Sequence, residues 1–380
     1  MRLYFIKDIK KSHLTCPMYL GKKVYVDTGS VIDNRIVDFD EFEYLKKPSR
    51  ANVCVATGDV LFAKMQNSIK VLEIDNVSKD YIFSTGFYCF RDSRILPSFL
   101  RYFFLSSVFN QQKDKLCYGA TMKAINDEGM SQISVNVPSM EEQKKIVDLL
   151  DSLTQSIEND KEQMKRIDEL VESYFIKLFG DPVENSLGLP VLTLNDVCSK
   201  ITDGTHDTPK KTQDGYLLVT GKNIRENDFV WDDKTYVSEQ DHKNIYRRCN
   251  PEKGDVLYTN IGANYGTALF NNLGFEFSMK NVALLKPSKN VVHGIFLWKC
   301  LNMMKANILA KNRTGGAQTF MGLSTIKNIE IPVPDYDTQL IFVKILEELN
   351  ELKATLQLRQ NTFNELLEKK LFELFITEGN

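Results

Sequence analysis

The chain repeats one pattern at a constant distance of 196 residues, and this repeat constrains the fold more than any other feature. Gly58-Asp59-Val60-Leu61 recurs as Gly254-Asp255-Val256-Leu257. Val137-Pro138, ahead of a long helical stretch containing Gln143, recurs as Val333-Pro334 ahead of Gln339. One Gly-Asp match means little, since the pair is common in turns. Several separated matches in a single register predict an internal duplication.

The repeated unit is a globular part followed by a long helix. A chain of 380 residues is also too long for one hydrophobic core, so several domains are expected. The repeat places a first globular domain at 1–137, a first long helix at 138–183, a second globular domain at 184–336 and a second long helix at 337–380.

Each globular part has the pattern of an α+β domain built around a curved sheet, because short apolar runs alternate with turn residues. The expected strands are 22–26, 53–55, 60–63, 69–74 and 86–90 in the first domain, and 215–220, 256–258, 266–270 and 281–286 in the second. One or two short helices are expected in each domain, with one placed at 97–110 in the first domain and one at 292–309 in the second.

The long helices have the periodicity of a coiled-coil seam. Residues 140–179 contain no Gly or Pro, and their apolar residues recur at alternating steps of four and three, interrupted only by Asp160. The second helix, expected from 338 to about 375, keeps the same phase, with Lys353 and Gln360 as interruptions. We expect an antiparallel two-helix rod, about 60 Å long at 1.5 Å per residue. The two globular domains would lie at its opposite ends, related by an approximate two-fold axis.

Further apolar residues lie beside this seam. A two-helix coil buries only a narrow stripe, so the wider face predicts a further protein partner, although the stripes could serve only to join the two helices. The candidate docking residues are Leu149, Leu170, Ile345, Leu352 and Leu366.

The net charge of −2 divides unevenly along the repeat. The globular parts have balances of +4 and +2, whereas the helices have −5 and −3. A polyanionic partner would therefore bind the globular parts and avoid the helices.

The polar loops of both domains hold the candidate contact residues. Asn and Gln can make bidentate bonds to adenine, and Lys can bind guanine or a phosphate. Gly- and Asn-bearing loops also occur simply as hairpin turns, and that interpretation stays open for each residue. The candidates are Lys64, Gln66, Asn67, Lys70 and Lys123 in the first domain, and His206, Lys222, Asn223, Arg225, Asn260, Asn264, Tyr265 and Gln318 in the second.

Signatures of catalysis are missing from the sequence. It contains no phosphate-binding loop, no dinucleotide-binding glycine pattern, no nucleophile elbow and no Pro-Pro dipeptide of the kind amino-methyltransferases use. The four histidines have no metal-ligand spacing; His206 between Asp203 and Asp207 fits a turn residue better than a metal ligand or a catalytic group. We therefore expect a non-catalytic binding protein without metal or cofactor. Seven scattered cysteines, no Cys-x-x-Cys pair, no signal peptide and no membrane span favour the cytoplasm.

The whole chain resembles the specificity subunit of type I restriction-modification systems. The resemblance is carried by the repeated Gly-Asp-Val-Leu, by the helix starts with Gln143 and Gln339, and by Asp203-Gly204-Thr205-His206 at the opening of the second domain. Gly315-Gly316-Ala317-Gln318, which leads to Val333-Pro334, belongs to the same pattern. The first domain departs from it, because it lacks a counterpart of the Asp-Gly-x-His segment and has Met122-Lys123 where the second domain has Gln318-Thr319.

The resemblance implies a function for each part. Each domain would read one half of a split sequence in double-stranded DNA, and the rod would fix the spacing between the halves. The helices would dock two adenine methyltransferase (modification) subunits, and motor-nuclease (restriction) subunits would join for cleavage. The alternative is a non-catalytic coiled-coil scaffold for protein partners. An enzyme that acts on DNA by itself is disfavoured by the missing motifs.

Overall fold

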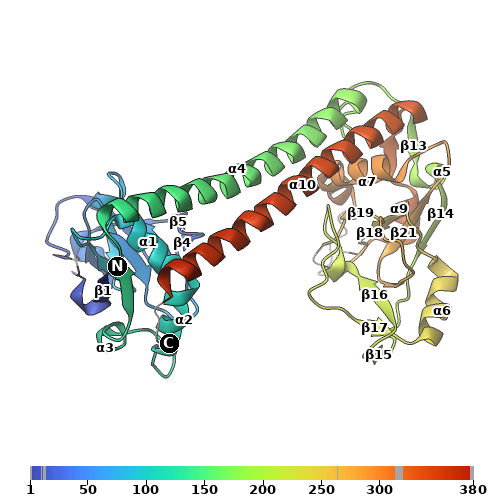
Figure 1. The fold of residues 1–380 in the computed structure, drawn as a ribbon. Helices are drawn as coiled ribbons and strands as arrows, with labels where there is room; N and C mark the ends of the chain where they lie inside the picture. The colour runs from blue at the N-terminus through green and yellow to red at the C-terminus, as the bar shows by residue number, and fades with distance from the viewer. Residues whose placement is uncertain (1, 10, 12–13, 263, 313–319, 377–380) are drawn as a thin grey trace. The chain divides into compact units, whose positions relative to one another are not determined.

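The computed structural model describes residues 2–9, 11, 14–262, 264–312 and 320–376 (Figure 1). The chain divides into two compact units, one made of Met1–Gln163 with Leu356–Asn380 and the other of Met164–Thr355. Two helices of 40 residues, α4 (Met140–Phe179) and α10 (Tyr336–Phe375), each contribute residues to both units.

The first unit contains a globular domain ahead of α4. Its strands are β1 (Arg2–Phe5), β2 (Leu14–Thr15), β3 (Lys22–Val26), β4 (Val31–Ile32), β5 (Arg35–Ile36), β6 (Asp40–Glu43), β7 (Ala51–Cys54), β8 (Val60–Ala63), β9 (Val71–Glu73), β10 (Ile82–Ser84), β11 (Phe87–Phe90) and β12 (Ser134–Val137). Its helices are α1 (Pro97–Leu105), α2 (Ser107–Lys115) and α3 (Asp127–Met130), with short 3-10 turns η1 (Ile6–Asp8), η2 (Tyr44–Lys46) and η3 (Ser78–Asp80).

Two sheets form the centre of this domain. One has the strand order β2-β7-β10-β3-β6, with β10 and β3 parallel, and the other has the order β11-β8-β9. Strand β8 is buried on both faces: Val60 and Phe62 pack with α1 and α2, whereas Leu61 and Ala63 pack in a core with residues of the five-stranded sheet. Burial on both faces explains why this strand is continuously apolar.

The second unit repeats this order of elements. Its strands are β13 (Val191–Thr193), β14 (Cys198–Asp203), β15 (Lys211–Thr212), β16 (Tyr216–Thr220), β17 (Tyr236–Val237), β18 (Val256–Tyr258), β19 (Ala268–Phe270), β20 (Ser278–Lys280), β21 (Ala283–Pro287) and β22 (Glu330–Pro332). Its helices are α5 (Leu194–Val197), α6 (Glu239–Cys249), α7 (Gly294–Met303), α8 (Lys305–Lys311) and α9 (Leu323–Lys327), with the 3-10 turn η4 (Gly221–Asn223).

The strand pairing shows that the two domains are copies. The parallel pair of β16 and β20 corresponds to β3 and β10, and the antiparallel pair of β18 and β21 corresponds to β8 and β11. Strand β18 is also buried on both faces, with Val256 and Tyr258 in one core and Leu257 in another, while α7 covers the β18-β19-β21 sheet (Figure 1). Helix α6 has no α-helical counterpart among the described residues of the first domain.

Each of the two helices expected to be continuous, at 97–110 and at 292–309, is instead a pair of helices. The expected helix at 97–110 breaks at Ser106, whose backbone is extended and whose hydroxyl accepts a hydrogen bond from Phe109 N at the start of α2. The expected helix at 292–309 breaks at Met304, between α7 and α8. Neither break carries a Gly or Pro, so helix-breaking residues gave no signal for it.

The repeated Gly-Asp pair makes the turn into the doubly buried strand. Gly58 and Gly254 have positive φ angles of 82° and 103°, which glycine adopts without strain. The aspartate that follows is buried and accepts the backbone N–H three residues upstream at 2.8 Å, Ala56 N for Asp59 and Glu252 N for Asp255. Each also pairs with a cation from the neighbouring segment, Arg91 and Lys286, at 2.8 Å.

The repeated glutamine ties each long helix to its domain. The buried amide of Gln143 accepts from Leu96 N at 2.8 Å and donates to Arg94 O and Pro138 O at 3.0 Å. Gln339 has the same three distances to His293 N, Val291 O and Pro334 O. The identical contacts account for the conservation of glutamine between the copies.

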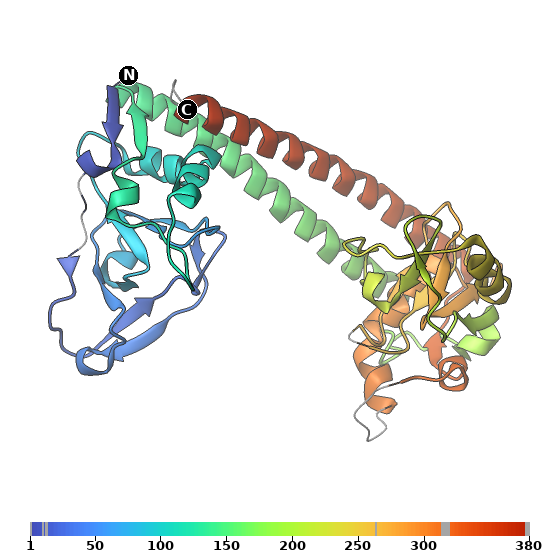
Figure 2. The same ribbon diagram turned by 90° about the horizontal axis from the view of Figure 1, so that it is seen from below.

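Within each unit, segments of the long helices run antiparallel. In the first unit, the last turns of α10 lie beside the early turns of α4 (Figures 1 and 2), with Leu150 and Phe375 in one core, and Asp160 pairs with Arg359 further along. In the second unit, Phe342 contacts Phe175 and Phe179, and Lys353 Nζ lies 2.6 Å from Asp168. Of the three polar interruptions of the seam, Asp160 and Lys353 are therefore partners in ion pairs.

Candidate nucleic-acid interface

A groove of about 530 Å³ opens on the second domain where five parts of the chain meet. Its walls come from the start of β15, the end of β16 with η4, the loop before β17, the loop after β18 and the end of β20. Four cations, Lys211, Lys222, Arg225 and Lys280, line it together with two carboxylates, Asp232 and Asp233. This excess of positive charge in a concave site suits a polyanion.

Two predicted contact residues hold the groove in shape instead of presenting their amides to it. The Asn223 side chain accepts from Thr220 N at 3.0 Å and donates to Val230 O at 3.1 Å. The Asn264 amide donates to Gly221 O at 2.8 Å and to Ile224 O at 3.1 Å. Short polar side chains commonly satisfy loop backbone in this way.

The predicted cations of this loop are exposed. Arg225 donates to Lys222 O and Ile224 O at 2.9 Å, which uses one of its two terminal nitrogens. The Lys222 side chain projects from η4, and the groove therefore presents charge from a fixed backbone. The structure brings these two predicted cations together with Lys211 and Lys280, which sequence reasoning missed.

His206 braces the neighbouring turn and does not line the groove. Its Nε2 lies 2.8 Å from Asp203 Oδ2 and its Nδ1 lies 3.1 Å from Asn281 Oδ1, while the other oxygen of Asp203 pairs with Arg248. Gly204 allows this turn because a Cβ there would lie 2.1 Å from Met279 O. Thr208 and Asn281, which flank the turn, do line the groove.

Of two further candidates, Asn260 is buried and Tyr265 is partly buried. Asn260 is 1% exposed, and within the described residues neither of its amide atoms has a hydrogen-bond partner. Tyr265 packs against the core that contains Tyr258, and burial raises the pKa of both phenols. Gln318, the remaining candidate of this domain, lies outside the described residues.

In the first domain, Lys64 belongs to a small network of polar and cation–π contacts after β8. Its Nζ donates to Thr85 O at 2.8 Å and lies 4.2 Å from the centre of the Tyr88 ring, which Lys11 also approaches at 4.9 Å. Burial lowers the pKa of Lys64. Asp127 accepts from Lys11 and from Tyr88, and these bonds hold the pKa of its carboxyl below the ordinary value.

Helix α2 supports the rest of this loop. Gln66 donates to Asp114 O at 2.9 Å, and Asn67 N, at a φ of 57°, donates to the Asp114 carboxylate at 3.0 Å. Lys123 is exposed, and its carbonyl accepts from Gln66 N at 3.0 Å, so Lys64, Gln66, Asn67 and Lys123 form one surface.

Lys70 lies on the β3 side of this domain, where it donates to Thr28 O at 2.5 Å.

The residues that sequence reasoning missed come from segments far apart in the chain. Lys211, Lys280, Asp232 and Asp233 meet only because β15, β16 and β20 belong to one sheet. The charged run Asp232-Asp233-Lys234 in a loop between strands was the available signal.

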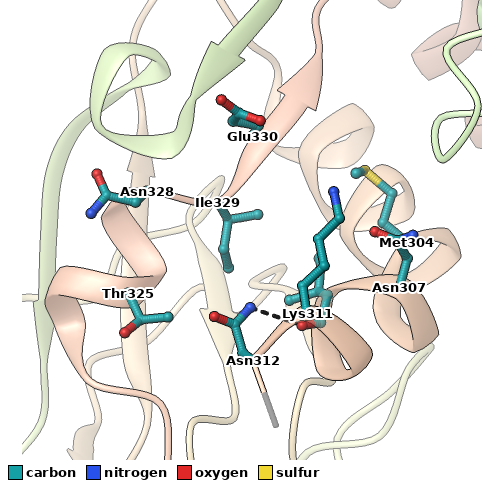
Figure 3. A pocket seen from close by; sticks show the side chains of 9 residues that line it. Met304, Asn307, Lys311, Asn312, Thr325, Asn328, Ile329 and Glu330 are labelled. Carbon is teal, nitrogen blue, oxygen red and sulfur yellow. Dashed lines mark hydrogen bonds between the residues drawn. The ribbon is translucent and has the colours of Figure 1, made fainter.

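A second hollow of about 310 Å³ lies between α8, α9 and β22 (Figure 3). Lys311 and Asn307 line it from α8, and Thr325, Asn328 and Glu330 from the opposite side. The first domain has a hollow of about 230 Å³ at the equivalent place, between the end of α2 and α3. Neither hollow contains a predicted contact residue.

The predicted docking leucines remain on the surface of the helices. Leu149, Leu170, Leu352 and Leu366 are 38–50% exposed, and Ile345 is half-buried. Among the described residues no cluster of His, Cys, Asp and Glu could hold a metal ion. Over the same residues, no helix combines the length and the apolar character that a membrane crossing needs.

The sequence matches the family described as type I restriction modification DNA specificity domain over residues 21–169 and 189–366. The specificity subunit of the type I restriction enzyme HindI of Haemophilus influenzae is 24% identical over 163 residues, which are 42% of this chain and 36% of that protein. The specificity subunit of the enzyme EcoKI of Escherichia coli is 19% identical over 207 residues, 51% of this chain and 44% of that protein. The matches thus span less than half the length of these curated relatives.

Two solved structures share the fold over nearly the full length. A chain from a type I R-M system, solved for its complex assembly and conformational transition, is 20% identical with a TM-score of 0.64 over 98% of this chain and 97% of that one. The S subunit of a type I restriction-modification system from M. genitalium is 16% identical with a TM-score of 0.58 over 99% and 96%.

Proposed function

This chain belongs to the family of type I restriction modification DNA specificity domains, and on that premise we propose that it reads a bipartite target in double-stranded DNA. Each globular domain contacts one half-site. The observation that carries the proposal is the groove of the second domain, where four cations meet in a concave site at loops that differ between the copies. Phosphate contacts by such cations supply affinity, and side chains at base edges supply specificity.

The long helices set the distance between the half-sites in this proposal. The antiparallel contacts found within each unit favour one continuous two-helix rod with the recognition domains at its opposite ends. Since the DNA duplex repeats every 34 Å or so, the length of such a rod selects the number of base pairs between the halves.

The partners follow from the exposed apolar residues of the helices. Leu149, Leu170, Leu352 and Leu366, with Ile345 beside them, dock two adenine methyltransferase subunits in this proposal, and restriction subunits join that assembly. The methyltransferase performs the base flipping and methyl transfer. The chain itself is a non-catalytic subunit and works in the cytoplasm, where its DNA lies.

The test uses the full chain assembled with its adenine methyltransferase partner. We expect steeply salt-dependent binding to duplex DNA, and methylation of a motif made of two half-sites. Exchanging residues 1–137 for another recognition domain changes one half-site and keeps the other. A complex that assembles and yet binds no duplex at low salt contradicts the proposal and supports a protein scaffold.

A further inference from the structure

The recognition groove of the second domain contains two carboxylates that its proposed function does not explain. Asp232 and Asp233 line the groove beside Lys222 and Arg225, and both are exposed. Within the part of the chain that the structure describes, neither carboxylate makes a hydrogen bond or an ion pair with these cations. Both carboxylates therefore remain available to accept hydrogen bonds from a ligand.

The loop that carries these carboxylates is firmly held. Val230 N donates to Asn223 O at 2.8 Å, and the Asn223 amide returns a bond to Val230 O at 3.1 Å. Trp231 stacks on Phe229 with ring centres 5.2 Å apart and an interplanar angle of 12°. Both carboxylates thus start from a backbone that packs on the domain core, as a residue that reads a base must.

Negative charge in this groove lowers affinity for DNA. A carboxylate repels phosphates over a Debye length of about 8 Å at physiological salt. It is also an acceptor only, so it cannot bond to the keto oxygens or the ring nitrogen N7 of bases. In the major groove, DNA compensates this loss only with an amino group, on N4 of cytosine or N6 of adenine.

We propose that Asp232 and Asp233 determine specificity in the major groove by accepting from amino groups of cytosine or adenine in one half-site and by rejecting guanine and thymine there. The inference rests on the proposed function and names the base chemistry that this groove reads. The surrounding cations hold the phosphates, and the carboxylates select the base edge. This division explains why acidic residues persist in a groove built for a polyanion.

The experiment compares Asp232→Asn and Asp233→Asn with the unaltered chain, each in the assembled methyltransferase complex. Asparagine keeps the shape and can both donate and accept, so it tolerates keto bases. We expect at least one of the variants to methylate targets with guanine or thymine at a position of one half-site where the unaltered complex requires cytosine or adenine, with a gain of about tenfold. Binding to unrelated duplex should tighten as the repulsion is removed.

Asp214→Asn is the matched control. Asp214 is exposed in the same domain and does not line the groove, so the variant makes the same change of net charge elsewhere. Its motif should stay unchanged, with binding altered less than about twofold.

The outcomes separate the inference from the function on which it rests. An unchanged motif in both groove variants, while the unaltered complex methylates a bipartite target, overturns the inference alone. Loss of all binding by variants whose melting temperature is unchanged also overturns it, because the carboxylates would then support affinity. Absence of any sequence-selective methylation by the unaltered complex refutes the proposed function instead.

Discussion

The two domains use the same scaffold but differ in the position that follows the doubly buried strand. In the first domain Lys64 stands there, half-buried over the Tyr88 ring and bonded to Thr85 O. In the second domain Asn260 stands there, almost fully buried, and the loop that follows forms one wall of an open groove. The turn before the strand and the glutamine at the helix start have the same hydrogen bonds in both copies. The loops that we assign to DNA therefore differ between the copies, whereas the shared hydrogen bonds hold each helix to its domain.

The largest expected effect distinguishes the two ion pairs between the long helices, one in each unit. Asp160 is 1% exposed and depends on Arg359, whereas the Asp168–Lys353 pair of the second unit is partly exposed. Arg359→Met should cause the largest loss in the free energy of unfolding, because it leaves the buried Asp160 carboxylate unpaired. Lys353→Met should cost about 1 kcal/mol or less. Urea denaturation of the full chain measures both.

A double variant serves as control for this prediction. Adding Asp160→Leu to Arg359→Met removes the stranded charge and should restore most of the lost stability. Equal losses for Arg359→Met and Lys353→Met would contradict the distinction between a buried and an exposed pair.

The next effect tests whether the two glutamines, which make the same contacts, also contribute equally to stability. Gln143→Ala and Gln339→Ala each remove three hydrogen bonds and leave buried backbone groups unpaired, so each should cost about 2 kcal/mol. The two losses should be equal, as measured by denaturation or by amide exchange in the first turns of α4 and α10. Gln111→Ala, at an exposed site of α2, should change stability by less than about 0.5 kcal/mol. Unequal losses would mean that the same hydrogen bonds contribute differently to the stability of the two copies.

The sequence predicted the long helices well because their apolar residues recur regularly over about 40 residues without Gly or Pro. The expected bounds 140–179 match α4, and the second helix begins at Tyr336, two residues before the expected start, because Asp335 supplies the cap. The breaks at Ser106 and Met304 were not predicted, since neither position has a Gly or Pro and only Ser106 has a side chain that caps the next helix.

The candidate site was predicted less well because one chain gives residue types without their contacts. Lys222 and Arg225 line the groove as expected, but the amides of Asn223 and Asn264 bond to backbone carbonyls of the groove walls. Lys280 and Asp232 could not be assigned to the groove in advance, since sheet pairing alone brings them together. Local composition identifies polar loops, whereas a surface is created by contacts between distant segments.

A smaller effect contrasts the recognition surfaces of the two domains. Lys222 is exposed in the groove, so Lys222→Ala should weaken duplex binding several-fold for every sequence and reduce the salt slope by about one. Lys64→Ala should change the slope less, because its ammonium is already bonded to Thr85 O. Titrations of the assembled complex at several salt concentrations distinguish the two.

Lys234→Ala provides the comparison for these variants, because Lys234 is exposed in the same domain and outside the groove lining. If Lys222→Ala leaves the salt slope equal to that of Lys234→Ala, the groove does not contact phosphates.

The smallest effect concerns the caps of the long helices. Both caps pair a carboxylate with a hydroxyl residue three positions away, but the two residue types have exchanged places between the copies. At the start of α4, the Glu142 carboxylate accepts from Ser139 N at 3.0 Å and from its hydroxyl at 2.8 Å. At the start of α10, the carboxylate belongs to the cap itself, and Asp335 accepts from Thr338 N at 2.8 Å and from its hydroxyl at 2.6 Å. These hydrogen bonds lower the pKa of both carboxyls below their ordinary values. Because the pKa is lower in the folded state, the stabilisation is complete above the ordinary pKa and is lost as pH falls through the folded one.

Amide exchange in the first turns of α4 and α10 should therefore accelerate together as the pH falls below about 4, after correction for the intrinsic rates. Glu142→Gln should remove much of this acid sensitivity from α4 and leave that of α10 intact. Glu141→Gln is the control, because the carboxylate of Glu141 pairs only with Lys145 at 2.7 Å in the described contacts and does not cap the helix. A helix start that stays equally protected down to pH 3 would show that its carboxylate is not needed as a cap. If only one helix start stayed protected, the two caps would differ in their contribution to stability. The copies would then be equivalent at the glutamine but not at the cap.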